Sequence, residues 1–434
     1  MPTQDDAPAP TVAPALGPSP LASGQETSVA DAQAAIAAAL QPVTDTETVP
    51  LTAAMGRVLA ADLLSPIDVP AHDNSAMDGY ALHGADLRSD APTRLVVMGA
   101  TVFAGPSRAP VVPSGHCIRI MTGAVMPAGL DTVVPQELCV RVGDAVTIEP
   151  GRLVPGENRR HRGEDLTRGR PALNAGRRLR PADLGLVASL GIGELTVRRR
   201  LRVALFSTGN ELRTLGQALD AGCIYDSNRF SLIAALERLG AEVVDLGLVR
   251  DDPAALGATL DEAIARADVV LTSGGVSVGD ADYTRELLAS RGEVAFWKVA
   301  MRPGRPFAFG PLRGGAVPRW LFALPGNPVA ALVTFYVFVR PALQQLAGAT
   351  PEPLPSLRAR SVAPIRRRPG RSEYQRGIVS LAADGEWEVR LTGTQGAGVL
   401  RSMSEANALV VLDPAQGSVA AGDRVPVWLF DGLV

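Results

Sequence analysis

Hydrophobic and polar positions follow two alternating periods between residues 201 and 348. Short apolar runs typical of buried strands are followed by stretches with the spacing of amphipathic helices. Strands that alternate with helices favour right-handed βαβ units, so we expect a doubly wound parallel sheet with helices on both faces. The pattern predicts strands at 201–206, 243–249, 267–272, 294–299 and 320–324, and helices at 230–239, 253–266, 283–290 and 327–346.

The regions on either side of this α/β pattern have a different periodicity. Short β-type runs separated by Gly and Pro come before it, and further strand-like runs follow residue 355. An alanine-rich helix is expected to begin near Ser28, and a second helical patch spans 182–190. We therefore predict a multidomain α/β plus β chain with a disordered tail at 1–28, an elongated linker domain made of 29–68 and 170–200, an inserted all-β domain at 69–169, an α/β domain at 201–348 and a C-terminal β-barrel domain at 349–434.

Composition and charge narrow the possible classes of function. The chain has 434 residues and a formal net charge of -3, so no global field favours nucleic acid or anionic lipid. Three cysteines without a C-x-x-C pair fit a reducing compartment. The longest apolar run that we identify, 329–339, is about half the roughly 20 residues that a membrane helix needs. No signal-peptide pattern opens the chain. We expect a cytoplasmic protein with neither a nucleic-acid nor a membrane partner.

Three loops of small and polar residues follow strands of the predicted parallel sheet. Glycine permits close backbone approach, so successive N–H groups can face a phosphate or pterin oxygen. The competing interpretation is a set of structural turns, with Asn327 capping the long helix and Pro328 in its first turn. A shared pocket is favoured because the carboxyl ends of parallel strands lie at one edge. The candidate binding residues are Ser207, Thr208, Gly209, Ser273, Gly274, Gly275, Ser277, Gly279, Pro325, Gly326 and Asn327.

Charged residues supply the second part of the candidate chemistry. Lys298 leaves a strand, and Arg302 and Arg305 flank a Pro-Gly pair, which makes a rigid basic hook for an oxyanion. Solvated surface charge is the competing interpretation of this hook. Acids in loops suit a hard divalent ion such as Mg²⁺ that bridges phosphate oxygens, although each alone also fits a cap or turn. These acids are Asp78, Asp165, Glu211, Asp251, Asp252 and Asp282.

Several segments occur in the order of a known family's signatures. They are 73–81, 120–124, 160–165, the glycine-rich loop continued by 281–283, then 301–307 and 324–328. Together they resemble the MoeA/gephyrin E-domain family of molybdopterin molybdenumtransferases, over roughly residues 28 to 432. The combined string is highly specific, while several pieces alone are weak.

The resemblance implies an elongated homodimer with a MogA-like α/β domain and an active site shared between that domain and the partner's inserted β domain. It implies molybdenum insertion from molybdate into the dithiolene of adenylated molybdopterin, with release of AMP, as the last step of molybdenum cofactor biosynthesis. Mg²⁺ and substrate delivery by the molybdopterin adenylyltransferase are implied too. The matching catalytic positions are Asp78, Thr122, Arg160, Asp165, Glu211, Asp251, Asp282, Lys298, Arg302 and Arg305, with Asp251 and Asp282 at the metal and Arg371 and Ser402 as further substrate contacts.

Three departures from the family pattern bear on activity. Arg302 and Arg305 replace lysines, which keeps the charge but changes a compact point charge into a planar fork. Asn210 stands where Asp is common, and Ala397 stands where a Ser hydroxyl is often found. These changes allow a divergent paralogue with altered activity.

Two other interpretations stay open on the sequence. The adenylyltransferase that makes the adenylated substrate has a similar α/β domain, but its loop typically continues with Thr-Gly where this chain has Val276. The flanking β domains also speak against it. A scaffold protein, as in gephyrin's clustering role, could lose the acids and the basic hook, and this chain retains both.

Overall fold

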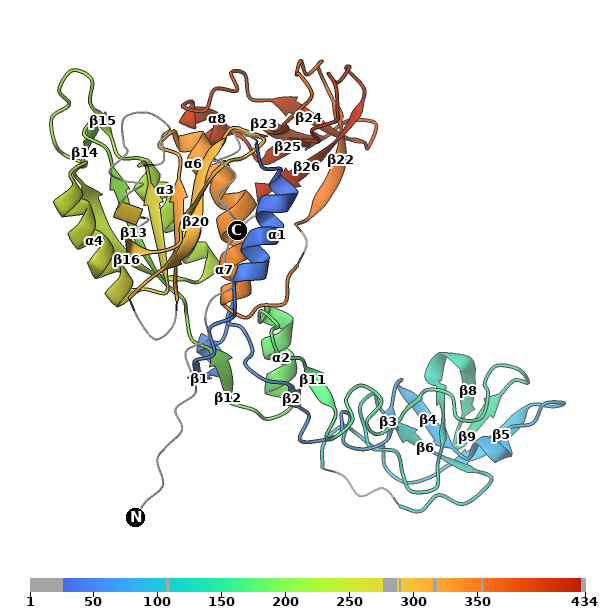
Figure 1. Cartoon of the computed structure of the whole chain (residues 1–434). Coiled ribbons are helices and arrows are strands. Elements are labelled where there is room, and N and C mark those ends of the chain that lie inside the picture. The colour runs from blue at the N-terminus through green and yellow to red at the C-terminus, as the bar shows by residue number, and fades with distance from the viewer. Residues whose placement is uncertain are drawn as a thin grey trace, which may run out of the picture.

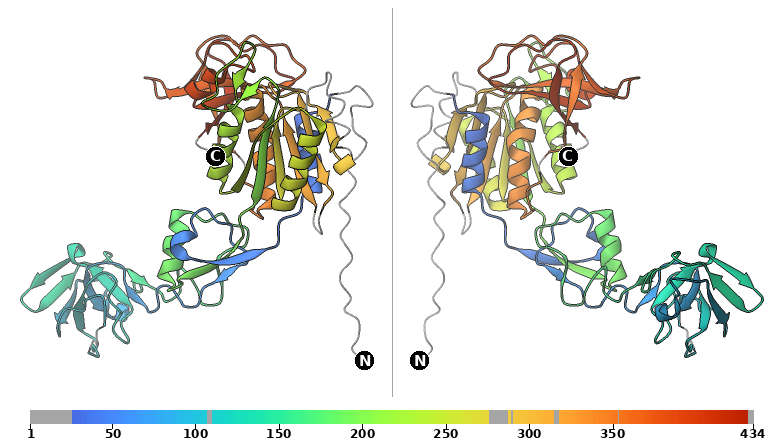
Figure 2. Two further views of the ribbon diagram at one scale, coloured as in Figure 1. Left: turned by 90° about the vertical axis from the view of Figure 1, so that its left-hand side faces the viewer. Right: turned by 90° about the vertical axis from the view of Figure 1, so that its right-hand side faces the viewer.

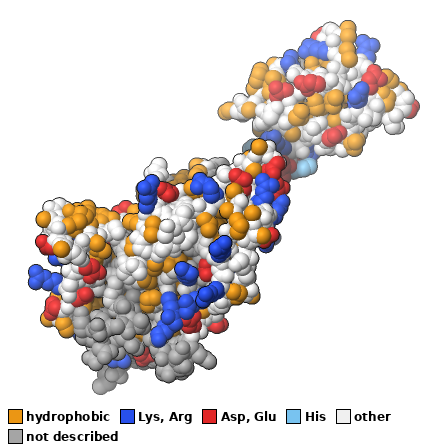
Figure 3. Space-filling view, turned by 90° about the horizontal axis from the view of Figure 1, so that it is seen from above, with side chains coloured by type: hydrophobic (Ala, Val, Ile, Leu, Met, Phe, Trp, Pro, Cys, Tyr) orange, Lys and Arg blue, Asp and Glu red, His pale blue; other side chains and the backbone are white. Residues whose placement is uncertain are grey.

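The computed structural model describes residues 26–106, 110–275, 287–288, 290–314, 318–352 and 354–430. The chain is elongated, with an α/β body beside a C-terminal barrel, a narrow linker, and a β module at the far end (Figures 1 and 2). In Figure 3 the distal β module stands apart from the body as a separate mass. The predicted fold class is confirmed, while the predicted domain limits remain a prediction.

A six-stranded sheet in the order β16-β13-β17-β21-β20-β18 forms the centre of the α/β body. The first four strands are parallel, and β20 runs antiparallel to both of its neighbours. Helix α4 packs on one face through Leu256 and Leu260, and α3 packs on the other through Leu232 and Leu236. The elements are β13 (Arg202–Thr208), β14 (Leu212–Arg213), β15 (Ile224–Tyr225), α3 (Asn228–Leu239), β16 (Glu242–Val249), α4 (Pro253–Arg266), β17 (Val269–Ser273), β18 (Ala295–Lys298), β20 (Pro306–Leu312) and β21 (Arg319–Leu324).

Strand β20 was not predicted, because its Gly310 and Pro311 resemble a turn. Buried Phe307 and Phe309 alternate with small residues there, so the aromatic rings fill one face of the sheet. The predicted helix at 283–290 lies largely outside the described residues.

The long helix predicted at 327–346 is present as α6 (Pro328–Thr334), a π-helical turn η5 (Phe335–Val339) and α7 (Arg340–Leu346). Its 19 residues are long and apolar enough to cross a membrane by length and composition, so it exceeds the apolar run identified from sequence. However, 78% of its most apolar window is buried inside the fold, as in a core helix. Helix α1 (Val29–Ala39) begins near Ser28 as predicted, is capped by the Ser28 side chain, and packs in the same core through Ala32 and Ile36.

The linker crosses between the body and the distal module twice, once outward and once on return. Its outward and return segments pair antiparallel, β1 with β12 and β2 with β11. Helix α2 packs on this ladder through Val187, beside Leu195 and Val197. The elements are β1 (Thr46–Pro50), η2 (Leu51–Ala53), β2 (Leu63–Leu64), β11 (Pro171–Leu173), α2 (Pro181–Ser189) and β12 (Glu194–Arg198).

The distal module is a β structure, as predicted. Its six-stranded sheet has the order β7-β4-β6-β5-β9-β8, and a separate two-stranded pair joins β10 to β3. Cores on the two faces contain Ile118 and Val133 on one side and Leu82 and Val146 on the other. The elements are β3 (Asn74–Ser75), β4 (Gly79–Leu82), η3 (Gly84–Asp86), β5 (Thr93–Val97), β6 (His116–Ile120), β7 (Thr132–Pro135), η4 (Gln136–Leu138), β8 (Cys139–Val142), β9 (Ala145–Ile148) and β10 (Arg159–Arg160).

The C-terminal region closes into a five-stranded barrel, because β23 pairs with both β24 and β25 while β22 and β26 complete the ring. Strand β22 carries Arg358 and Arg360, and these charges interrupt the apolar alternation of its sequence. Strand β19 belongs to the basic hook and adds to β23, which ties the hook to the barrel. The elements are β19 (Met301–Arg302), β22 (Ser356–Ser361), β23 (Ser372–Leu381), β24 (Trp387–Leu391), α8 (Leu400–Glu405), β25 (Ala408–Leu412) and β26 (Arg424–Leu429).

Candidate functional site

The three predicted loops meet at the carboxyl edge of the α/β sheet. Ser207 pairs with Ser273 across β13 and β17, and Ser273 pairs with Leu324 across β17 and β21. The amide of Gly274 donates to the carbonyl of Leu324 at 3.1 Å. Gly274 has φ +95°, and a Cβ there would lie 2.3 Å from the carbonyl oxygen of Thr208. The close approach of these loops therefore needs glycine at this position.

Buried polar side chains beneath this edge hold the loops in place. The amide nitrogen Nδ2 of Asn228 donates to Ser273 Oγ and to the carbonyl of Gly326, both at 2.7 Å. Ser207 Oγ donates to Asp226 Oδ1 at 3.0 Å. Asp226 and Asn228 lie at the start of α3, and we did not assign them to the site from sequence. The available signal was the polar segment 226–228, which follows the polar loop at 207–209 and precedes the helix predicted at 230–239.

The acids near this edge have different partners. The hydroxyl of Thr208 donates to the Asp251 carboxylate in a short hydrogen bond. Asp252 instead caps α4, accepting from the amides of Ala254 at 3.1 Å and Ala255 at 3.2 Å. The carboxylate of Glu211 folds back over Gly209, where an added Cβ would lie 2.7 Å from Glu211 Oε2. Asp251 and Glu211 therefore offer oxygen donors at this edge, and Asp252 serves the helix.

The predicted cluster of six acids does not form within one chain. Asp78 and Asp165 belong to the distal module, which Figures 1 and 2 show apart from the α/β body that carries Asp251. Within the described ranges, no three His, Cys, Asp or Glu side chains gather as a metal site would require. Asp282, Ser277 and Gly279 lie outside the residues that the structure describes, so their predicted roles stay predictions.

The 324–328 loop starts α6 and contacts the barrel. Pro328 occupies the first turn as predicted, but the Asn327 side chain makes no capping hydrogen bond. Asn327 is exposed at the carboxyl edge, after Pro325 and Gly326. The amide of Val329 donates to the carbonyl of Ala397 at 3.0 Å, so the barrel loop at 395–398 reaches this helix start. The structure therefore brings the barrel to the same edge as the glycine loops.

The basic hook leaves the sheet at this carboxyl edge, because β18 runs in the direction of β21. Gly304 has φ +99° and lies against α6, where an added Cβ would meet Thr334 Oγ1 at 2.4 Å. Arg302 and Arg305 are exposed, as expected of a cation site. Arg302 faces an open cavity of about 1110 Å³ that is lined by Glu26, Arg302, Arg366, Arg367, Arg368, Pro369, Gly370, Arg371, Glu373 and Ser418. Lys and Arg side chains gather on the face of the body seen from above in Figure 3.

Arg371 of this cavity and Arg305 of the hook together hold one carboxylate. Arg371 donates to Glu26 at 2.6 and 2.9 Å, and Arg305 lies 2.5 Å from Glu26 Oε1. The hydrogen bond from Arg371 is the main cause that lowers the pKa of Glu26. Glu26 was read from sequence as part of a tail and was therefore missed.

Beneath the hook, Arg376 is a buried cation held by neutral groups. Its Nε donates to Ser402 Oγ at 3.0 Å, and its Nη2 donates to the carbonyl of Gly396 at 3.1 Å. Burial, and then the nearby charge of Arg302, lowers the Arg376 pKa to about 10. Ser402 is itself buried and donates to the carbonyl of Val399 at 2.6 Å. The Ser402 hydroxyl, which is predicted to contact the substrate, is thus engaged in holding Arg376.

The predicted residues of the distal module form a second group. Asp78 Oδ1 accepts from both the amide and the hydroxyl of Thr122, each at 2.7 Å. The hydroxyl bond, followed by the amide bond, lowers the Asp78 pKa. Arg160 pairs with Asn74 across β10 and β3, and the amide of Asp165 donates to the carbonyl of Val69 at 3.0 Å. Both Arg160 and Asp165 are exposed.

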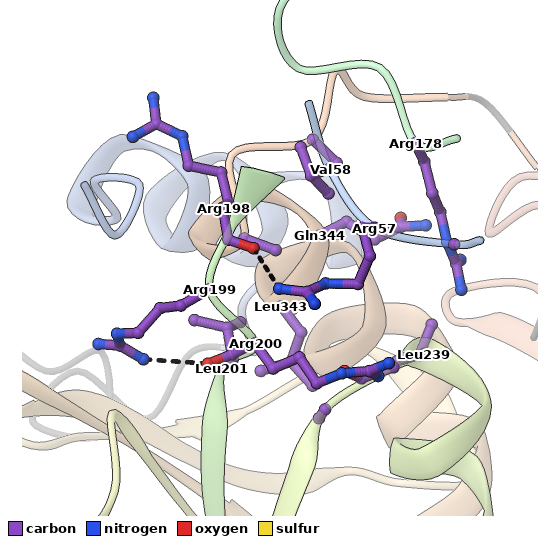
Figure 4. Close-up of a pocket in the computed structure, with 15 residues that line it drawn as sticks. Arg57, Val58, Arg178, Arg198, Arg199, Arg200, Leu201, Leu239, Leu343 and Gln344 are labelled. Atoms are coloured by element: carbon purple, nitrogen blue, oxygen red, sulfur yellow. Dashed lines mark hydrogen bonds between the residues drawn. The ribbon is translucent and has the colours of Figure 1, made fainter. Parts of the chain in front are cut away.

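A further arginine-rich hollow, shown in Figure 4, lies where the linker meets the body. Arg57 donates to the carbonyl of Arg198 at 2.8 Å, and Arg199 donates to the carbonyl of Arg200 at 3.0 Å. Arg199 also makes a paired contact with Asp268 at 2.7 and 2.9 Å. These arginines are engaged in holding the joint between linker and body.

Three regions of the chain match models of known protein families. Residues 27–191 match the MoeA N-terminal region (domain I and II), and residues 358–430 match the MoeA C-terminal region (domain IV). Residues 204–345 match a probable molybdopterin binding domain. The chain belongs to the MoeA family. Matches on both flanks of the α/β region speak against the adenylyltransferase interpretation, which accounts for that region alone.

Close relatives extend over most of the chain. It is 42% identical over 393 residues to the molybdopterin molybdenumtransferase of Haemophilus influenzae, covering 90% of this chain and 95% of that protein. It is 40% identical over 390 residues to the molybdopterin molybdenumtransferase of a Nostoc species, covering 88% of each. The crystal structure of the molybdopterin biosynthesis MoeA protein from Pyrococcus horikoshii superimposes with a TM-score of 0.77 at 27% identity, covering 94% of this chain and 100% of that one.

Proposed function

We propose that this MoeA-family protein inserts molybdenum from molybdate into the dithiolene of adenylated molybdopterin, releases AMP and thereby completes the molybdenum cofactor. The proposal is supported above all by three glycine-containing loops and a basic hook that meet at one edge of one sheet. Relatives named molybdopterin molybdenumtransferase agree with it. A transferase acting on two anionic substrates needs fixed donors and local cations, and this edge carries both.

The loops at the carboxyl edge would hold the adenylated substrate. Gly274 has no side chain to cover the backbone N–H groups around it. The Asn228 side chain fixes the Ser273 and Gly326 segments relative to each other. Such prearranged groups need little reorganisation when phosphate oxygens arrive. Asn327, which is exposed and not used as a cap, is available to contact the substrate.

The basic hook would hold molybdate. Molybdate is a dianion that must approach a ligand already carrying phosphate charge, so cations have to offset the repulsion. Arg302 and Arg371 line the cavity beside the carboxyl edge, and Arg305 forms an ion pair with Glu26, which also lines it. Two dithiolene sulfurs then replace two oxo ligands of molybdenum, which leave with protons as water. Water adds to the phosphoanhydride, and AMP departs.

A divalent cation fits the donors at this edge, and we propose Mg²⁺. The carboxylates of Asp251 and Glu211 lie beside Thr208 and Gly209, and hard oxygen donors are what Mg²⁺ prefers. Asp282 would complete the set. When bound, the ion would polarise the phosphoanhydride. Removal of divalent ions with a chelator should abolish AMP release, and Mg²⁺ should restore it.

We further propose a homodimer in which the partner's distal module completes the site. Asp78, Thr122, Arg160 and Asp165 lie in that module, and within one chain the linker keeps them away from the body (Figure 1). A cytoplasmic location and delivery of substrate by the molybdopterin adenylyltransferase belong to the same proposal.

The test is release of AMP from adenylated molybdopterin by the purified chain with Mg²⁺, with and without molybdate. The expected result is release stimulated by molybdate, with a product that activates a cofactor-free molybdoenzyme. Tight binding of the substrate without release would contradict the proposed transfer and would favour a carrier or scaffold.

A further inference from the structure

The segment before α1 places a carboxylate inside the basic cavity. Glu26 Oε1 lies 2.5 Å from Arg305 Nη2 and 2.6 Å from Arg371 Nη2, so one carboxylate bridges the hook and the barrel. We propose that Glu26 occupies part of the oxyanion site and competes with molybdate for Arg305 and Arg371. This inference rests on the proposed function, because it assigns molybdate to these arginines.

The backbone around Glu26 is fixed to the hook. The amide of Thr27 donates to the carbonyl of Lys298 at 2.9 Å, and the amide of Ala300 donates to the carbonyl of Thr27 at 2.8 Å. Ser28 then caps α1 by accepting from the amide of Asp31 at 3.0 Å. Thr27 is thus bound to the hook and Ser28 to α1. The backbone next to Glu26 is therefore fixed, and it holds the Glu26 carboxylate beside the two arginines.

The charges around Glu26 favour an anion. Among the residues that the structure describes, Glu26 is the one carboxylate that forms an ion pair with Arg305 or Arg371. The other acid of the cavity, Glu373, accepts instead from Gln375 Nε2 at 2.7 Å. Arg302 and the run Arg366 to Arg368 add positive charge to the same cavity. The cavity therefore remains cationic with Glu26 in place, and becomes more so without it.

The ion pairs are open enough to exchange. The side chains of Arg305 and Arg371 are 47% and 44% exposed, and that of Glu26 is 22% exposed. Exposed ion pairs contribute little net stability because water solvates both charges well. An incoming dianion can thus replace the carboxylate on the guanidinium groups, which suit the flat faces of a tetrahedral oxyanion. Glu26 would set the molybdate concentration at which the site fills.

The experiment is a calorimetric titration of the full-length protein with sodium molybdate at constant ionic strength. For Glu26→Gln, which keeps the shape but removes the charge, we expect the Kd to fall about fivefold or more, because a unit charge at contact distance is lost. Glu26→Asp, with a shorter reach, should give an intermediate Kd. Arg371→Gln should weaken binding.

A matched control is Glu352→Gln, which removes another exposed carboxylate held by arginine, at 2.7 and 2.8 Å from Arg180. It should leave the Kd for molybdate unchanged. If Glu26 only ties α1 to the barrel, or aligns the arginines for the oxyanion, Glu26→Gln will leave the Kd unchanged or raise it. Either result overturns the proposal. Melting curves of each variant show whether the fold is retained.

The molybdate Kd and the release of AMP together distinguish failure of this inference from failure of the proposed function. Tighter molybdate binding by Glu26→Gln without AMP release in any variant would leave the competition standing and remove the transferase. AMP release by the wild type with no change of Kd in Glu26→Gln would support the transferase and contradict the competition. No heat of molybdate binding in Glu26→Gln would contradict the competition.

Discussion

The carboxyl edge of the α/β sheet and the Asp78–Thr122 corner of the distal module are built by different means. At the sheet edge, backbone lies against backbone, with Gly274 packed below the Thr208 carbonyl and buried Asn228 tying two loops. At the distal corner, partly exposed side chains hold one another. Asp78 accepts from Thr122, and ion pairs join Asp73 to Arg159 and Asp68 to Arg162 nearby.

The structure of the sheet edge depends on shape, whereas that of the distal corner depends on charge. The sheet edge is set by sterics and neutral hydrogen bonds, so added bulk should disrupt it more than salt does. The distal corner is set by partly exposed charges, which salt screens and single substitutions remove without unfolding. Variants at the two places should therefore fail in distinguishable ways.

The largest effect is expected from Gly274→Ala. The new methyl group would overlap the Thr208 carbonyl at a left-handed φ, so the loops must separate. We expect adenylated-substrate binding to fall by about 100-fold and stability to fall by about 3 kcal/mol or more. Denaturant unfolding and substrate titration measure both.

The control for that substitution is Gly222→Ala, which has φ +83° but nothing within 4 Å of the added Cβ. It carries only the backbone strain of about 1 kcal/mol. Equal losses in the two variants would contradict a steric origin for the sheet edge.

A smaller effect on stability, but a clear one on turnover, is expected from Asp78→Asn. The exposed corner should lose about tenfold to 100-fold in AMP release as its charge disappears, with little change in melting temperature. Asp90→Asn serves as the control, since Asp90 pairs with Arg88 on the surface of the same module. A drop in melting temperature equal to that of Gly274→Ala would remove the contrast between the two regions.

Mixing two impaired chains tests whether the two regions work across subunits. Asp78→Asn and Asp251→Asn should each keep at most about a tenth of the wild-type activity alone, and unfolding and refolding them together should restore about a quarter of it. That value follows if mixed dimers form at random and have one intact site. If mass measurement shows that mixed dimers form but no activity is recovered, both regions belong to a site within one chain.

Substitutions at the joint between linker and body should lower the stability of the protein more than its activity. Burial raises the Asp268 pKa, but hydrogen bonds from Arg199 and from the Arg202 amide outweigh it, so its pKa is lowered. A lowered pKa gives stability that is present above the ordinary carboxyl value and is lost as pH falls through the folded value. Asp268→Asn should cost about 2 kcal/mol, seen as a lower melting temperature at neutral pH. Asp261→Asn, which breaks the exposed pair with Arg291, should cost about 0.5 kcal/mol or less.

The smallest effect is expected from Thr122→Val. The Thr122 hydroxyl is the main cause of the lowered Asp78 pKa, while the amide bond remains in the variant. The Asp78 pKa should therefore rise towards its ordinary value, and the acid limb of the pH–rate profile should move to higher pH. Activity at neutral pH should fall only a fewfold. An unmoved limb would show that Asp78 does not set it.

Much of the fold was predictable because the hydrophobic period of most elements agrees with their burial. The strands at 202–208 and 269–273 and the helix at 253–266 are examples. β20 was missed because Gly310 and Pro311 locally resemble a turn. Pairing with β18 and β21 instead determines that this segment is a strand. At the site, convergence of the three loops followed from sheet geometry. The roles of Asn228 and Glu26 did not, because a hydrogen bond across 45 residues, or an ion pair across 345, leaves no local pattern.

The double crossing of the linker has a consequence for how far the distal module reaches. Two antiparallel strands, with Val49 opposite Leu195, connect it to the body. A tether of this kind resists twisting, and its length changes only in steps of strand register, since a shift by one residue would turn Leu195 and Val197 from the core to the solvent. Evolution could therefore vary the loops of either region freely, but could alter their separation only by matched insertions in both strands.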